Sequence, residues 1–197
     1  ALGFPHVDSG AMYRGVTLYA QQHGLLENKK LKTEILLSQL DDIHLRFEGD
    51  TFWLNGVDVS AEIRSMQVSE AVSLVAAIPE VRTFLVAQQR IMGANQSVVM
   101  DGRDIGTVVF PKADLKLFLT ADVNIRAQRR FDELSAQNAS TSVEEVRNNL
   151  AERDHLDSTR ADSPLVQAAD AVPLDATQFT IESMREHVLD LVAEYLN

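Results

Sequence analysis

The chain has no cysteine among its 197 residues, so disulfide bonds and thiolate metal sites are excluded. Its five histidines are scattered and lack the spacing of paired ligands, which argues against a dedicated zinc site. No apolar run approaches the roughly 18 residues that a membrane-spanning helix needs, and no secretory signal peptide is visible. These absences are compatible with a reducing compartment, and we expect a cytoplasmic protein without a membrane partner.

Positive charge is also scarce, because 18 Lys and Arg residues face 29 Asp and Glu residues and the formal net charge is −11. This balance argues against a protein that coats nucleic acid, so we expect no nucleic-acid partner. The 13 arginines nevertheless outnumber the 5 lysines, and a guanidinium group grips carboxylates and phosphates bidentately as an ammonium group cannot. The excess reflects either a bias of composition or an anion site, and the positions of the arginines must decide.

The length and the 45% apolar content suit one domain with a sizeable core. Residues 43–60 alternate apolar and polar side chains around Gly49-Asp50 and Asn55-Gly56, which predicts a small antiparallel meander. The apolar runs 97–101 and 115–122 predict buried, neighbouring parallel strands, and 171–174 a short last strand. Helical patterns cover 13–23, 25–40, 66–77, 79–92, 142–158, 181–196 and the segment after Asp122.

Local signals mark several of these helix starts. Asp122 is placed to cap the helix that follows it, Ser142 and Glu145 have the spacing of a capping box, and Pro79 suits a first helical turn. Strands that alternate with helices predict an α/β layer architecture in which the meander is an inserted lobe.

The segment DGRDIGT, residues 101–107, directly follows a predicted strand. Ligands of open α/β sheets bind beyond the carboxyl ends of the strands, so Asp101, Arg103 and Asp104 stand where a site belongs. The alternative is a solvated turn in which Arg and Asp pair locally. The position favours the site.

Two further segments concentrate positive charge. RAQRR, residues 126–130, places three arginines within little more than a helical turn, where like charges repel unless an anion satisfies them, although such a segment is usually a solvated basic face. Arg153, Asp157 and Arg160 have the spacing of one helix face, either as a surface ion pair worth about 0.3–0.5 kcal/mol or as part of an anion site. Together the segments favour phosphoryl transfer, which needs positioning and charge neutralisation.

Six segments resemble, in order and spacing, those of the bacterial cytidylate kinases: LGFPHVDSGAMYR, EIR, SLVAAIPEVR, DGRDIGTVVFP, RAQRR and ERDHLDSTRADSPL. These enzymes are nucleoside monophosphate kinases and transfer the γ-phosphoryl group of ATP to CMP or dCMP. The resemblance covers the whole chain, and D-S-G-x-x-Y-R together with D-G-R-D-x-G-T is highly specific. It implies the P-loop nucleoside monophosphate kinase fold, a parallel sheet flanked by helices with an inserted antiparallel β lobe and a helical lid.

The resemblance also implies how the chain is divided into parts and which ligands it binds. The core would comprise 1–30, 92–125 and 161–197, the monophosphate-binding lobe 31–91, and the lid 126–160. The lid would close over both nucleotides and exclude water. The ligands would be CMP, dCMP and ATP, with Mg²⁺ bound to ATP, and we expect a monomer.

Roles of individual residues follow from the same resemblance. The residues implied to bind the acceptor nucleotide are Ser9, Tyr13, Arg14, Ser73, Arg82, Asp104, Arg153 and Asp157. Those implied to act on the transferred phosphoryl group are Arg103, Arg129 and Arg160. Those implied to bind ATP are Arg126 and Arg130.

The chemistry of the base agrees with three of these residues. Cytosine offers a 4-amino donor beside N3 and O2 acceptors, whereas uracil reverses the first two. A carboxylate or hydroxyl at the amino group, with Arg82 at N3 and O2, would therefore favour cytosine and penalise uracil. Without the resemblance, Arg82 would be interpreted as an exposed charge, and Tyr13 is equally well interpreted as a core aromatic.

The family's glycine-rich phosphate loop, G-x-x-x-x-G-K-[ST], is missing from these 197 residues. In the family it lies upstream of the segment that here begins ALGF, on the central strand of the sheet. We therefore expect a cytidylate kinase whose first segment lies outside this sequence. Two alternatives remain: a non-catalytic nucleotide-binding relative that lost the loop, and a kinase for another nucleoside monophosphate.

We expect residues 1–197 alone not to transfer phosphate, because no glycine-rich turn followed by a Lys is present to hold the β- and γ-phosphates. Without the central strand, apolar edges would be exposed and the fragment would fold weakly and aggregate. The measurement is ATP-dependent CDP formation by residues 1–197 and by a version extended upstream. Strong activity of residues 1–197 alone would contradict this account of ATP binding.

Overall fold

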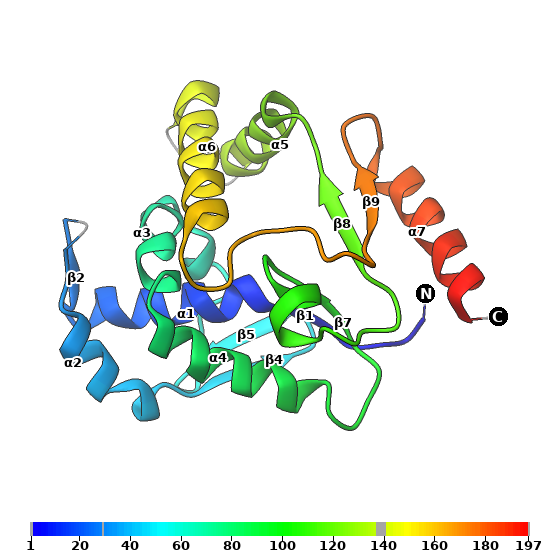
Figure 1. The fold of residues 1–197 in the computed structure, drawn as a ribbon. Helices are drawn as coiled ribbons and strands as arrows, with labels where there is room; N and C mark the ends of the chain where they lie inside the picture. The colour runs from blue at the N-terminus through cyan, green and yellow to red at the C-terminus, as the bar shows by residue number, and fades with distance from the viewer. Residues whose placement is uncertain (1, 29, 137–140, 197) are drawn as a thin grey trace. The chain divides into compact units, whose positions relative to one another are not determined.

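A computed structural model describes residues 2–28, 30–136 and 141–196. The chain forms two compact units (Figure 1). The first unit comprises Ala1–Ile105 and Arg160–Pro164, and the second comprises Gly106–Thr159 and Leu165–Asn197. No helix in the described ranges is long and apolar enough to cross a membrane.

The first unit is built around the helix α1 (Ser9–Gln22), which directly follows the strand β1 (His6–Asp8). The carboxylate of Asp8 accepts a hydrogen bond from the backbone N–H of Ala11 at 2.9 Å and so caps the helix. This cap starts the helix earlier than the apolar pattern from Tyr13 predicted. The predicted helices α3 (Met66–Ala76) and α4 (Pro79–Met92) are confirmed and both contact α1. Their apolar faces and that of α1 form the core of the unit.

The predicted meander is confirmed within the first unit. It consists of β4 (Leu45–Glu48), β5 (Thr51–Leu54) and β6 (Val57–Asp58), all antiparallel. Asn55 and Gly56 both have positive φ, at 49° and 80°, as the tight turn between β5 and β6 requires. A turn of 3-10 helix over Glu62–Arg64 then leads towards α3.

The predicted helix over residues 25–40 is wrong in its first half. The segment begins with a hairpin of β2 (Leu26–Glu27) and β3 (Lys30–Leu31), and only then forms α2 (Thr33–Ser38) and a turn of 3-10 helix over Leu40–Asp42. The backbone of Asn28 lies in the left-handed region, at φ 50°, which a right-handed helix does not accommodate. The apolar spacing alone did not reveal this break.

The predicted strands at 97–101 and 115–122 exist, but the predicted pairing between them is not found in the described residues. β7 (Val99–Asp101) pairs in parallel with β1, whereas β8 (Leu117–Thr120) pairs in parallel with β9 (Val172–Asp175), as Figure 1 shows. Among the described residues no ladder joins β7 to β8, since each strand has a different partner. Their predicted burial is also wrong, since Val99 is 48% exposed and Leu119 is 58% exposed.

The second unit contains α5 (Val123–Ala136), α6 (Val143–Thr159) and α7 (Ile181–Leu196), and a single π-helical turn spans Ile105–Val109 at its start. α5 and α6 lie side by side (Figure 1). The predicted helix caps are confirmed. Asp122 accepts from the backbone N–H groups of Asn124 and Ile125, and Ser142 and Glu145 exchange the two hydrogen bonds of a capping box.

The boundary between the units follows Ile105 and therefore falls inside the segment 92–125 that we assigned to the core. Compactness alone does not define a lobe or a lid, so the division into a core, a lobe and a lid stays a prediction. The α/β class itself is confirmed by the two parallel ladders and the helices that connect their strands.

Gly15 lies where α1 contacts β5, and its lack of a side chain permits this contact. A Cβ at Gly15 would lie 2.8 Å from Cε1 of Phe52 and 3.1 Å from Cδ2 of Leu45. Replacing a helical glycine by alanine ordinarily stabilises a helix by roughly 1 kcal/mol, but overpacking a core costs about 1–3 kcal/mol. We therefore expect Gly15→Ala to lower the free energy of unfolding in urea. The loss should shrink in a Phe52→Leu background, and a gain in stability would contradict the close packing.

Candidate functional site

The structure divides the residues singled out from the sequence between the two units. The first unit contains Ser9, Tyr13, Arg14, Ser73, Arg82, Arg103, Asp104 and Arg160. The second unit contains Arg126, Arg129, Arg130, Arg153 and Asp157.

Two sequence motifs meet where β1 and β7 end. Asp8 and Asp101 are partners in the parallel ladder, so the start of α1 adjoins the loop that carries Arg103 and Asp104. The hydroxyl of Ser9 donates to the backbone carbonyl of Asp101 at 2.7 Å. A Cβ on Gly102 would lie only 2.2 Å from Oγ of Ser9, so this approach requires the glycine. The motifs D-S-G-x-x-Y-R and D-G-R-D-x-G-T therefore lie at the carboxyl ends of parallel strands, where the sequence placed a site.

The loop that follows β7 also contributes Asp104 to a buried ion pair with Arg82. The guanidinium of Arg82 on α4 donates through Nη2 to Oδ2 of Asp104 and through Nη1 to the carbonyl of Ala76 at 3.2 Å. Arg82 is 3% exposed and Asp104 is 5% exposed, so the interpretation of Arg82 as an exposed charge is wrong. Its Nε is buried and has no hydrogen-bond partner among the described residues. This N–H donor is therefore unsatisfied within the described residues.

The ring of Tyr13 lies 5.4 Å from Cζ of Arg82, within the range of a cation–π interaction. Burial raises the pKa of the Tyr13 phenol to about 12, and the charges of Arg82, Asp104, Arg160 and Asp162 modify this effect. The phenol is therefore neutral at physiological pH, and its buried hydroxyl has no partner among the described residues. Tyr13 is a buried aromatic of the core, and its role towards a ligand stays a prediction.

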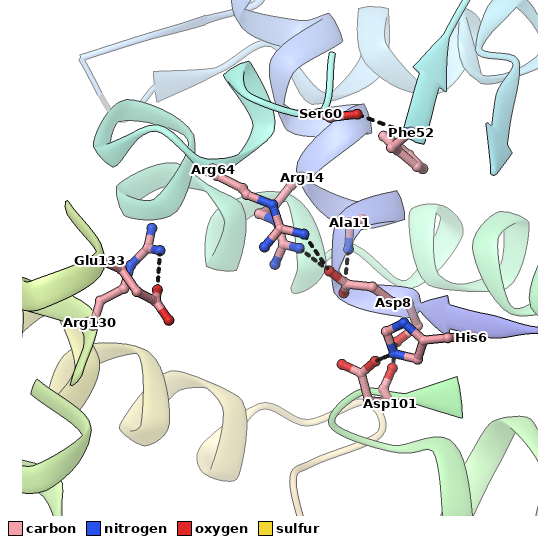
Figure 2. A network of polar contacts seen from close by, with 11 residues as sticks. His6, Asp8, Ala11, Arg14, Phe52, Ser60, Arg64, Asp101, Arg130 and Glu133 are labelled. Atoms are coloured by element: carbon pink, nitrogen blue, oxygen red, sulfur yellow. Dashed lines mark hydrogen bonds and ion pairs between the residues drawn. The ribbon is translucent and has the colours of Figure 1, made fainter. Parts of the chain in front are cut away.

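Figure 2 shows the polar network in front of α1. Arg14 donates through Nη2 to Oδ2 of Asp8 at 2.5 Å, and Nη2 of Arg64 lies 4.0 Å from the same oxygen. Burial lowers the pKa of Arg14, and the carboxylate of Asp8 opposes this effect. Nearby, Nε2 of His6 contacts Oδ1 of Asp101 at 2.6 Å.

Sequence reasoning assigned no role to Asp8 or Arg64. The position of Asp8 directly before Ser9-Gly10 was a recognisable N-cap signal, and its partner six residues later is Arg14. Arg64 ends the EIR segment. This segment resembles the family, but the resemblance implies no role for the charge of Arg64. The sharing of one carboxylate by both arginines depends on the tertiary fold and left no signal in the sequence.

Arg160 is not on the helix face that the spacing predicted. α6 ends at Thr159, and Arg160 begins a separate segment that belongs to the first unit. Its Nε donates to the carbonyl of Ser163 at 2.7 Å, and the hydroxyl of Ser163 donates to the carboxylate of Asp162 at 2.6 Å. Arg153 and Asp157 stay on α6, where Asp157 is buried.

The three arginines of RAQRR each have a partner within the second unit. Arg126 donates to Asp154 at 2.7 Å, Arg130 donates to Glu133 at 2.9 Å, and Arg129 donates to three backbone carbonyls in the turn after β9. The argument that their mutual repulsion requires an external anion therefore fails. Their role towards a phosphate ligand stays a prediction.

No group of three or more His, Cys, Asp or Glu side chains within the described ranges could hold a metal ion. The site in the first unit instead offers arginines, hydroxyl groups and the carboxylates of Asp8, Asp101 and Asp104. Arginines of this kind can bind a polar anionic molecule through charge-assisted hydrogen bonds.

Comparison with known proteins finds cytidylate kinases that are similar to almost the whole chain. The profile of the cytidylate kinase family matches residues 1–194. The chain is 50% identical over 196 residues to the cytidylate kinase of Parabacteroides distasonis, which covers 96% of this chain and 85% of that protein. It is 47% identical over 200 residues to the cytidylate kinase of Bacteroides fragilis, with 98% and 86% covered. It is 48% identical over 197 residues to the cytidylate kinase of Flavobacterium psychrophilum, and the match covers 97% of this chain and 87% of that protein.

The buried ion pair makes a stability prediction. Arg82→Met removes the guanidinium that faces the buried carboxylate of Asp104, and we expect the free energy of unfolding to fall by about 3–5 kcal/mol. A double variant, Arg82→Met with Asp104→Leu, should recover most of this loss because it removes both charges. Urea unfolding measures each value. Arg90→Met, at an exposed position on the same helix, is the control and should change stability by about 1 kcal/mol or less, because exposed interactions of a guanidinium contribute little. A single variant as stable as the parent would contradict the assigned pair.

Proposed function

Because the chain belongs to the cytidylate kinase family, we propose that it catalyses the ATP-dependent phosphorylation of CMP and dCMP to CDP and dCDP. The observation that carries the proposal is the meeting of the two motifs at the carboxyl ends of β1 and β7, in the unit that buries Arg82 against Asp104. An enzyme of this kind works chiefly by positioning two nucleotides and neutralising charge, and the first unit supplies groups for both tasks.

Arg82, Asp104 and Ser73 would recognise the base. The guanidinium of Arg82 suits the acceptor side of cytosine, where its single Nε–H would donate to N3 or to O2, and a carboxylate or hydroxyl oxygen suits the 4-amino group. The ion pair supports this role because it fixes both groups before the nucleotide arrives. Uracil would present a donor at N3 to the guanidinium and an acceptor at O4 to the carboxylate, and both contacts are unfavourable.

The acceptor phosphate and the transferred phosphoryl group would be held by Arg14, Arg103 and Arg160. Ser9 and Tyr13 would complete the pocket, with the neutral phenol as a hydrogen-bonding group. These three arginines, Ser9 and Tyr13 all belong to the first unit. Arg103 is exposed on its loop, and the charge of Arg160 acts on the phenol of Tyr13. Guanidinium groups suit this task because they bind phosphate bidentately and keep their charge at all relevant pH values.

The residues of the second unit would have the remaining roles. Arg153 and Asp157 would contact the ribose, Arg126 and Arg130 would bind ATP, and Arg129 would act on the phosphoryl group. These assignments rest on the family resemblance. ATP would be the phosphoryl donor and would bring Mg²⁺, for which the described residues provide no ligand cluster of their own.

The proposal is tested by nucleotide binding and by phosphoryl transfer. Calorimetry should detect binding of CMP and dCMP, with weaker binding of UMP. In the assay of CDP formation, a version extended upstream of Ala1 should form CDP and dCDP from ATP. Binding of CMP without transfer would identify a non-catalytic nucleotide-binding relative, and preferred phosphorylation of another monophosphate would assign a different acceptor.

Arg82→Met should weaken CMP binding and reduce the preference for CMP over UMP, because the cytosine acceptors lose their charged donor. The loss in CMP affinity should be on the order of ten- to a hundredfold, since such a hydrogen bond contributes about 1.5–3 kcal/mol. Calorimetry on the folded fraction measures both nucleotides. Ser73→Ala, which retains the ion pair, provides a second variant for the same comparison. Unchanged affinity and selectivity in Arg82→Met would remove Arg82 from the site.

A further inference from the structure

We propose that Asp8 is a positioning residue that fixes the guanidinium of Arg14 towards the phosphate of the acceptor nucleotide. The inference rests on the proposed function, in which Arg14 binds that phosphate. Neither the sequence motifs nor the base chemistry gave Asp8 a part in the site.

The carboxylate of Asp8 is held by contacts in two directions (Figure 2). Oδ1 accepts from the backbone N–H of Ala11 at 2.9 Å, and Oδ2 accepts from Nη2 of Arg14 at 2.5 Å. The backbone of Asp8 is itself fixed, because the residue pairs with Asp101 in the parallel ladder. The position of the guanidinium therefore follows from the strand end and the first turn of α1.

Arg14 needs such a partner because most of its side chain is removed from water. The side chain is only 18% exposed, and its buried Nε has no hydrogen-bond partner among the described residues. A Cβ on Gly10 would lie 3.1 Å from both Nη1 of Arg14 and Oδ1 of Asp8, so the guanidinium rests directly over the first turn of α1. Asp8 therefore caps the helix and holds the guanidinium of Arg14 over its first turn at the same time.

The ion pair leaves Arg14 able to bind a ligand. A guanidinium has five N–H donors, and Asp8 accepts from Nη2 alone. Asp8 also lies 4.0 Å from Arg64, so one carboxylate is shared by two guanidinium groups. At the neighbouring strand end, His6 contacts the carboxylate of Asp101, and the negative charge of Asp101 also acts on Arg14. Ordering a long side chain before binding reduces the entropy that the complex loses.

The test is Asp8→Asn, because asparagine is an equally good N-cap and its side-chain oxygen still accepts from Ala11. Its amide NH₂ group would face Arg14 in place of an oxygen, so the N-cap is kept while the ion pair with Arg14 and the longer contact with Arg64 are lost. We expect calorimetry to show CMP affinity reduced on the order of ten- to a hundredfold, with the affinity for cytidine, which has no phosphate, unchanged. Asp8→Ser, a second good N-cap, should give the same pattern. It controls for effects of the asparagine NH₂ group, which serine lacks.

A double-mutant cycle checks the route of the effect. If Asp8 acts through Arg14, the variant Asp8→Asn with Arg14→Met should bind CMP no more weakly than Arg14→Met alone. Asp122→Asn is the matched control, since Asp122 caps α5 through backbone N–H groups and belongs to the second unit. It should leave the affinities for CMP and cytidine unchanged.

Three results would overturn the inference: unchanged CMP affinity in Asp8→Asn and Asp8→Ser, equal losses for CMP and cytidine, or additive effects in the cycle. Equal losses would mean that Asp8 supports the fold of the pocket and not the phosphate contact. These results leave the proposed function intact, because the parent still binds CMP. A parent that binds no CMP would instead overturn the proposed function, and the inference with it.

Discussion

The parallel pairing of β1 with β7 determines what the first unit can do. It brings the end of a strand at Asp8 to the same level as the end of another at Asp101, more than ninety residues later in the chain. The first turn of α1 and the loop that contains Arg103 and Asp104 then adjoin, and the bond from Ser9 to the carbonyl of Asp101 joins them. A slip of the register would separate Ser9 from this carbonyl and would turn alternate side chains to the opposite face. The site is therefore a consequence of one ladder.

The charges of this unit are arranged before any ligand is bound. An acidic protein of net charge −11 repels nucleotides at long range, so the attraction must be local. Burial supplies this local attraction, because the hydrogen bonds of Arg82 and Arg14 with a polar ligand are strengthened where water is excluded. The cost of burying these guanidinium groups is offset by Asp104 and Asp8, which pair with them while some donors stay available. Each carboxylate thus both stabilises and orients an arginine.

The parts of the fold that were predictable from the sequence are those with local signals. Asp122, Ser142 and Pro79 mark helix starts through their own chemistry, and Asn55-Gly56 marks a hairpin, so these elements were found correctly. The hairpin around Asn28 was missed because its apolar residues have a spacing that a helix also shows. The burial of Arg82 was beyond pattern reasoning, since its partner Asp104 lies 22 residues away and outside its helix. The roles of the site residues came from the family motifs, and only their contacts came from the structure.

The arginines of the second unit illustrate why a surplus of positive charge in a sequence is weak support for a ligand. Arg126 and Arg130 have carboxylate partners, and Arg129 is held by backbone carbonyls 47 to 50 residues away that no periodicity could indicate. These partners do not prevent phosphate binding, because partly exposed ion pairs contribute only about 0–1 kcal/mol and are easily exchanged. A phosphate with several acceptor oxygens would replace a carboxylate at Arg126 at little cost, whereas the buried pair of Arg82 and Asp104 would persist in the complex. The two kinds of arginine therefore suit different tasks: the buried pair suits the constant recognition of a base, and the exchangeable pairs suit a nucleotide that enters and leaves in each turnover.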